Sequence, residues 1–147
     1  MTVTAAPAPA PLLLKDTLLA RWASVRASLV LEGAPENRAL TEAARLGALE
    51  SWETINGLRR RERAVGSAAA ASTLEAALRP LQNVVIQLLR SPGDAVGADE
   101  AVRSAQRSFE RVAESGVARI DPRAVTAVRA VFRSLHELLR RPISRAA

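Results

Sequence analysis

Apolar residues recur in steps of three and four along most of the chain, which is the spacing of side chains on one face of an α-helix. The first such stripe runs from Leu14 to Leu29, and Gly33 and Pro35 predict the end of that helix. A second helix is predicted from about Pro35 to about Arg63. Small side chains in the middle of its apolar face would allow a partner helix to approach closely.

The third predicted helix begins with a capping-box pattern, in which Ser72 is followed three residues later by Glu75. An apolar stripe in steps of three and four follows, and Gly66 with residues 67–71 predicts the connection before it. Pro80 interrupts the stripe. Because proline lacks a backbone N–H and clashes with the preceding turn, the helix is either kinked at Pro80 or begins there, and we favour the kink.

Two further helices are predicted after a loop at residues 91–97. The fourth helix is expected to end at Gly116. The fifth has the clearest start in the chain, because Asp121 can cap free N–H groups while Pro122 occupies the first helical position, and Pro142 stops the helix. The apolar stripes are Val102, Ala105, Phe109 and Val112 in the fourth helix, and Val125, Val128, Phe132, Leu135 and Leu139 in the fifth.

These segments predict an all-α fold, a single-domain bundle of about five helices with the third kinked or interrupted at Pro80. A chain of 147 residues is long enough for one domain with a buried core. Residues 12–142 are predicted to form the bundle and residues 143–147 a C-terminal tail. Residues 1–11 are rich in alanine and proline and are predicted to form a flexible, extended arm.

No segment reaches the roughly 18 apolar residues that a membrane span requires. The uncharged N-terminal stretch is broken by Pro7, Pro9 and Pro11 and has no basic residue ahead of it, so it does not resemble a signal peptide. We therefore expect a cytoplasmic protein without a membrane span.

Arginine supplies 20 of the 21 cationic side chains, and the formal net charge is +6. Lysine and histidine occur once each, at Lys15 and His136, and cysteine and tyrosine are absent. Metal clusters, thiol nucleophiles and Ser/His/Asp triads need residue types that are missing here or present in a single copy, and no cofactor is predicted. The arginine excess fits two explanations, which are the composition of a G+C-rich genome and contact with nucleic acid or another anionic surface.

Two groups of arginines are candidate nucleic-acid contacts. The first lies at the predicted end of the second helix, where cations also interact favourably with the helix dipole. The second is spaced four residues apart on the fourth helix, where it forms either a solvated face, relieved by Glu100, Glu110 and Glu114, or a ridge that contacts a phosphate backbone. The candidate residues are Arg59, Arg60, Arg61 and Arg63 in the first group and Arg103, Arg107 and Arg111 in the second.

His136 is the sole candidate general base, and Arg129 precedes it by two helical turns. This pair resembles the Arg-x(4–6)-His element of HEPN-type ribonucleases, in which a base and a phosphate-binding arginine lie together on a late helix. The resemblance is carried by Arg129 and His136 alone, and Ala130 stands where those enzymes commonly have a polar residue. The alternative is a histidine at the core boundary, satisfied by water or by Glu137.

An extra apolar row on the fifth helix, with Ala124, Val131 and Leu138, predicts that this helix is either central to the bundle or half of a homodimer interface, with Val131 and Leu138 as the interface residues. The leading hypothesis is a non-enzymatic adaptor or small subunit of a larger assembly that contacts RNA or DNA backbone through arginines. The second is a protein-interaction or oligomerisation module without nucleic acid. The third is an HEPN-like ribonuclease.

Overall fold

A computed structural model of the chain describes residues 14–115 and 120–140, all of whose regular elements are α-helices. The expected all-α fold is therefore confirmed. The predicted arm at residues 1–11, the tail at residues 143–147 and the helix end at Gly116 lie outside the described residues. The five helices are α1 (Leu14–Leu31), α2 (Glu36–Ala64), α3 (Ala68–Arg90), α4 (Ala95–Glu114) and α5 (Pro122–Arg140).

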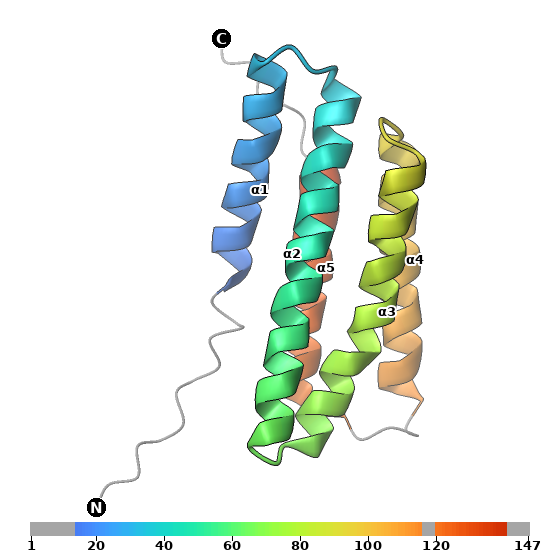
Figure 1. The fold of residues 1–147 in the computed structure, drawn as a ribbon. Helices are drawn as coiled ribbons and strands as arrows, with labels where there is room; N and C mark the ends of the chain where they lie inside the picture. The colour runs from blue at the N-terminus through green and yellow to red at the C-terminus, as the bar shows by residue number, and fades with distance from the viewer. Residues whose placement is uncertain (1–13, 116–119, 141–147) are drawn as a thin grey trace, which may run out of the picture.

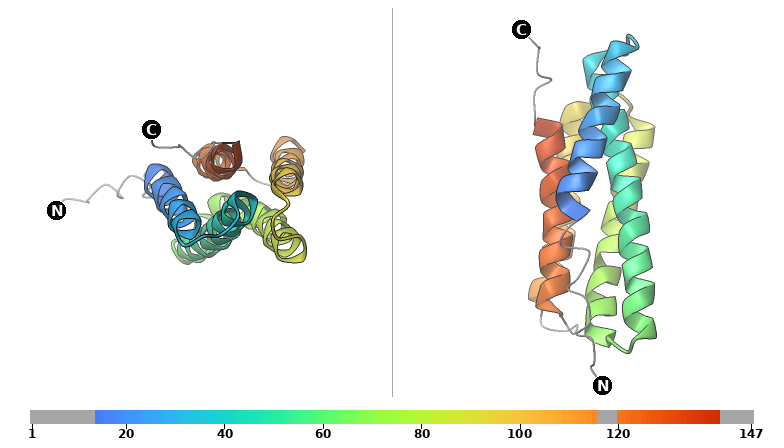
Figure 2. Two further views of the ribbon diagram at one scale, coloured as in Figure 1. Left: turned by 90° about the horizontal axis from the view of Figure 1, so that it is seen from above. Right: turned by 90° about the vertical axis from the view of Figure 1, so that its left-hand side faces the viewer.

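The helices run up and down beside one another, as Figure 1 shows. In the end-on view of Figure 2, α4 and α5 lie along one side of the bundle, with α2 and α3 along the other and α1 next to α2. Both α2 and α5 contact all four of the other helices. The fifth helix is thus central to the bundle, which was the first of its two predicted roles.

The core lies along these two central helices. All five residues of the predicted α5 stripe are buried, and Phe132 packs against Phe109 of α4 with 6.2 Å between the ring centroids. From α1, Trp22 is fully buried, whereas Val25 and Leu29 of the predicted stripe are only partly buried. The face that α1 presents to the bundle carries Arg26 instead, whose Nη1 donates to the Leu138 carbonyl oxygen at the end of α5 at 3.5 Å.

The start of α3 differs from the prediction. The helix begins at Ala68, so the capping box at Ser72 is wrong and residues 68–71 are helical rather than part of the connection. The reason is the run of alanines at these positions, because alanine has the highest helix propensity and extends the helix backward. The helix also continues through Pro80 without a break, and the kink at that residue stays a prediction.

The starts of α4 and α5 follow the chemistry of aspartate caps. Asp121 Oδ1 accepts hydrogen bonds from the backbone N–H groups of Arg123 at 2.8 Å and Ala124 at 3.4 Å, which confirms the predicted cap before Pro122. Asp94 does the same for α4 by accepting from Gly97 N at 2.8 Å. This second cap lies inside the stretch predicted as a loop, so α4 starts earlier than expected.

Two buried threonines tie distant segments together. Thr73 Oγ1 donates to the Ala69 carbonyl oxygen at 2.8 Å and accepts from Asp121 N at 2.9 Å, which joins α3 to the start of α5. Thr41 Oγ1 likewise accepts from Gly93 N at 2.9 Å and joins α2 to the α3–α4 turn. Both threonine side chains are buried, and each hydroxyl supplies the acceptor for a partly buried backbone N–H group.

Replacing Thr73 with valine is expected to lower the free energy of unfolding by about 1–2 kcal/mol, because Asp121 N would lose its acceptor while keeping its place in the fold. Urea denaturation followed by circular dichroism measures the change. Thr126→Val is the matched control, since the exposed Thr126 hydroxyl bonds only within its own helix, to the Pro122 carbonyl oxygen. Equal effects at the two positions would show that the link from α3 to α5 contributes nothing.

No helix among the described residues is long and apolar enough to cross a membrane.

Candidate functional site

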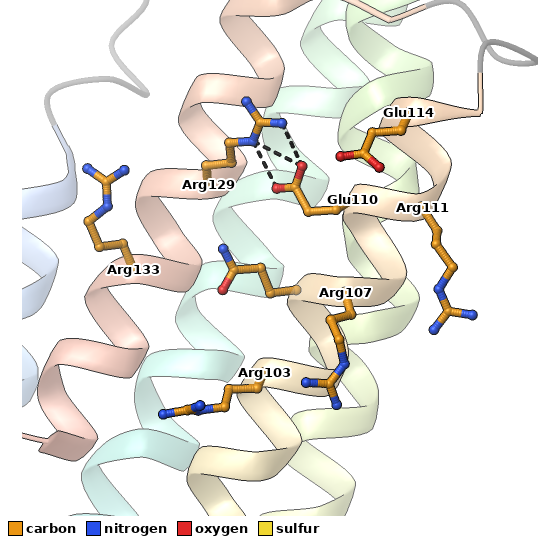
Figure 3. A pocket seen from close by; sticks show the side chains of 8 residues that line it. Arg103, Arg107, Glu110, Arg111, Glu114, Arg129 and Arg133 are labelled. Carbon is orange, nitrogen blue, oxygen red and sulfur yellow. Dashed lines mark hydrogen bonds and ion pairs between the residues drawn. The ribbon is translucent and has the colours of Figure 1, made fainter.

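An open cavity of about 700 Å³ lies along α4 and α5, and arginines dominate its lining. Five arginines and two glutamates face it, which leaves three positive charges in excess. Figure 3 shows these side chains extending from the two neighbouring helices. We call it the α4–α5 cavity, and its lining residues are Arg103, Gln106, Arg107, Glu110, Arg111, Glu114, Arg129 and Arg133.

The predicted row of arginines on α4 forms one side of this cavity. Its members are four residues apart, so each lies about 6 Å further along the helix axis than the last. Arg103 Nε pairs with Asp99 Oδ2 at 3.0 Å and Arg107 Nη2 with Glu100 Oε1 at 3.0 Å, both in exposed positions where ion pairs are weak. Arg111 has no ion pair with a described residue. The row therefore keeps much of its charge available to solvent.

Arg129 enters the cavity from α5 and meets Glu110 of α4. Two nitrogens of its guanidinium contact the carboxylate, with Arg129 Nε donating to Glu110 Oε2 at 2.8 Å and Nη2 donating to Oε1. These hydrogen bonds lower the pKa of Glu110 below its ordinary value, against an opposing effect of burial, and they raise the pKa of Arg129. A carboxyl whose pKa is lowered by folding stabilises the protein above its unfolded pKa, and that stabilisation is lost as the pH falls through the folded pKa.

Arg133 is the cavity arginine that sequence analysis missed, as it also missed Gln106. Arg133 lies one turn beyond Arg129 on α5, is exposed, and has no ion pair with a described residue. The four-residue spacing that identified the α4 row also relates Arg129 to Arg133, so the same rule could have found it. Arg133 also borders a smaller cavity whose other lining residues are His136, Glu137 and Arg140.

His136 is held by a carboxylate from another helix. Its Nδ1 lies 2.7 Å from Asp99 Oδ1, and its Nε2 lies 3.2 Å from Arg140 Nη1. Because arginine can only donate, a hydrogen bond from Arg140 requires Nε2 to accept, and Nδ1 is then the ring nitrogen that donates to Asp99. The structure thus gives His136 a partner, Asp99, that the sequence analysis did not name; it had suggested water or Glu137. Unlike Arg129, His136 does not line the α4–α5 cavity, so the two residues of the HEPN-like pair border different cavities.

The arginines at the end of α2 lie apart from the α4–α5 cavity. Arg59 donates to Asn56 Oδ1 at 2.9 and 3.3 Å, and Arg63 pairs with Glu75 of α3 at 3.0 Å. Arg61 and Arg63 stand in the last turn of the helix, where they complement its dipole. None of the cluster's members lines the α4–α5 cavity. This α2 cluster consists of Arg59, Arg60, Arg61 and Arg63.

The two residues predicted for a dimer interface occupy different environments. Leu138 is fully buried within the core of the single chain, while Val131 is partly buried and packs against that core. Leu138 would therefore have to leave the core before it could contact a second copy.

The part of the chain that the structure describes contains no group of three or more His, Cys, Asp or Glu side chains that could hold a metal ion. Neither a protein-family model, nor a curated protein, nor a solved structure matches this chain. The interpretation of the site therefore depends on its own geometry.

Proposed function

We propose that the protein is a non-enzymatic helical adaptor or small subunit that contacts the backbone of a nucleic acid through the α4–α5 cavity. The observation that carries the proposal is the convergence of five arginines from two helices on one open cavity. Two of them, Arg111 and Arg133, have no ion pair with a described residue. A cytoplasmic location, expected from the sequence, is part of this proposal.

The length of the arginine row favours a polyanion over a single phosphate. Arg103 and Arg111 are separated by about 12 Å along the helix axis, so one phosphate cannot reach the whole row. A nucleic-acid strand carries phosphates at short, regular intervals, and the planar guanidinium can form two hydrogen bonds to each.

Backbone contact is favoured over base contact by the position of the aromatic residues. Non-specific proteins for single strands stack bases on exposed aromatic rings. Here Trp22, Phe109 and Phe132 are fully buried, and Trp52 is partly buried against the core. We therefore expect binding that depends on charge and salt and little on base sequence.

The second candidate is a protein-interaction module, and three exposed apolar side chains favour it. Leu31, Leu89 and Val96 are 88%, 59% and 83% exposed. They belong to the ends of α1 and α3 and the start of α4, which lie at the same end of the bundle in Figure 1. Scattered apolar residues are common on protein surfaces, so we place this function after nucleic-acid binding. The ribonuclease stays third, since Arg129 and His136 border different cavities.

Changing Arg111 and Arg133 together to glutamine is expected to weaken binding to a fluorescent single-stranded RNA by about tenfold or more, because two charge-assisted contacts are lost. The slope of log affinity against log salt should fall by about 1.4 for a single strand. Fluorescence anisotropy across a salt series measures both, with a DNA duplex as the second probe. Circular dichroism should show that the variant remains folded, since both side chains are exposed.

The matched control is Arg38→Gln with Arg79→Gln, which removes the same charge from exposed positions outside the cavity. An equal loss in this control would contradict a localised site. Changing all four arginines of the α2 cluster tests whether that cluster also contributes. If the parent protein shows no salt-dependent binding, the nucleic-acid proposal is discarded and the interaction module remains. Stronger binding to polyglutamate than to nucleic acid would lead to the same conclusion. RNA cleavage that requires His136 would favour the ribonuclease instead.

A further inference from the structure

The Glu110 carboxylate accepts hydrogen bonds from the Arg129 guanidinium in the same way that a phosphate would. It receives hydrogen bonds from Arg129 Nε, at 2.8 Å to Oε2, and from Nη2 to Oε1. Two parallel N–H···O bonds of this kind are the arrangement by which a guanidinium binds phosphate oxygens. Both side chains line the α4–α5 cavity, and Figure 3 shows the pair bridging the two helices.

We expect the pair to contribute little to holding the two helices together. The side chains of Arg129 and Glu110 are 46% and 23% exposed, and ion pairs with this much solvent access contribute little to stability. The fully buried Phe109 and Phe132 already join α4 to α5 through a direct ring contact. We therefore look for a role of the Glu110 carboxylate other than joining the two helices, given its position among the five arginines of the cavity.

On the assumption of the proposed function, we infer that Glu110 is an internal competitor for the nucleic-acid backbone. It holds the Arg129 guanidinium in the free protein, and a backbone phosphate displaces it on binding. Glu114, whose negative charge also acts on Arg129, adds to the same competition. The carboxylate thus sets the affinity of the cavity. A ligand with one phosphate has to offset the loss of the internal ion pair by that single contact, whereas a ligand with several phosphates also contacts the other arginines, so the carboxylate favours ligands with several phosphates.

Glu110→Gln tests this inference, because glutamine keeps the size and one acceptor but removes the charge. The variant is expected to bind the single-stranded RNA about three- to fivefold more tightly than the parent, the range set by the strength of an exposed ion pair. Its salt slope should stay close to that of the parent, since Arg129 contacts a phosphate in both complexes and the number of neutralised phosphates is the same. Glu53→Gln is the matched control, as Glu53 is exposed on α2, outside the cavity, and carries the same charge. Its effect should stay below about twofold, because salt screens distant charges.

The same comparison in an Arg129→Gln background separates competition from a general gain of positive charge. With Arg129 absent, Glu110→Gln should improve binding by less than about twofold, so that the two changes are strongly non-additive. An undiminished gain in that background would overturn the inference, as would unchanged affinity of Glu110→Gln in the parent background. Either result leaves the proposed function intact as long as the Arg111 and Arg133 variant still loses affinity. A parent protein that binds no nucleic acid discards both.

Discussion

Replacing Phe132 with alanine is expected to lower the free energy of unfolding by about 3–5 kcal/mol. The side chain is fully buried and packs against Phe109, and α5 contacts every other helix of the bundle. Removing the ring therefore leaves a cavity where surrounding helices cannot collapse without moving one another. Urea denaturation followed by circular dichroism at 222 nm measures the change.

Phe132→Leu is the graded control, because leucine refills most of the space and should recover more than half of the loss. A loss below about 1 kcal/mol for Phe132→Ala would mean that the ring is not a core residue and that α5 is rotated relative to the bundle.

The predictions that succeeded rest on interactions between near neighbours in the sequence. The start of α5 could be predicted because Asp121 and Pro122 act within one turn of the helix that they begin. The buried stripe that includes Phe132 follows from periodicity alone, since a helix with one apolar face turns that face toward the core. These features need no knowledge of where other helices lie.

The error at the start of α3 has a local cause as well. Ser72 and Glu75 have the spacing of a capping box, but four alanines precede Ser72 and favour the helical conformation themselves. The capping-box pattern predicted a helix start at Ser72, but the helix begins four residues earlier, at Ala68. A cap motif is therefore informative only when the residues before it disfavour a helix.

The candidate site could be predicted in part. The row from Arg103 to Arg111 shares one face of α4 by spacing alone, and the structure places the whole row on one cavity. Its companions on α5 depend on how the two helices pack, which no local pattern determines. The same is true of the partners Glu110 for Arg129 and Asp99 for His136, which are 19 and 37 residues away.

Replacing Trp22 with alanine should also lower the free energy of unfolding by about 3–5 kcal/mol, for a reason that involves a glycine. Trp22 is fully buried and lies against Gly47 of α2. A Cβ atom at Gly47 would stand 2.8 Å from Trp22 Cδ2, closer than such atoms approach, and 3.0 Å from Leu135 Cδ2, which is a tight contact. Gly47 thus has a specific structural role, since the absence of a side chain at this position makes room for the indole ring.

Gly47→Ala is therefore expected to destabilise the protein by about 1–3 kcal/mol, although alanine favours a helix more than glycine does. Gly57 lies on the same helix, and a Cβ atom there would meet nothing within 4 Å. Gly57→Ala should accordingly stabilise the protein by up to about 1 kcal/mol. Opposite signs at two glycines of one helix would distinguish steric crowding from helix propensity.

Combining the changes gives the sharpest test of the contact between α1 and α2. Once Trp22 is alanine, the indole atoms no longer crowd Gly47 and the end of the Leu135 side chain can move into the vacated space. Adding a methyl group at Gly47 should then stabilise the double variant by up to about 1 kcal/mol instead of destabilising it. Thermal and urea denaturation of the two single variants and the double variant measure this reversal. A penalty for Gly47→Ala that persists without the indole would show that Leu135 or the backbone of α2, and not Trp22, requires the glycine.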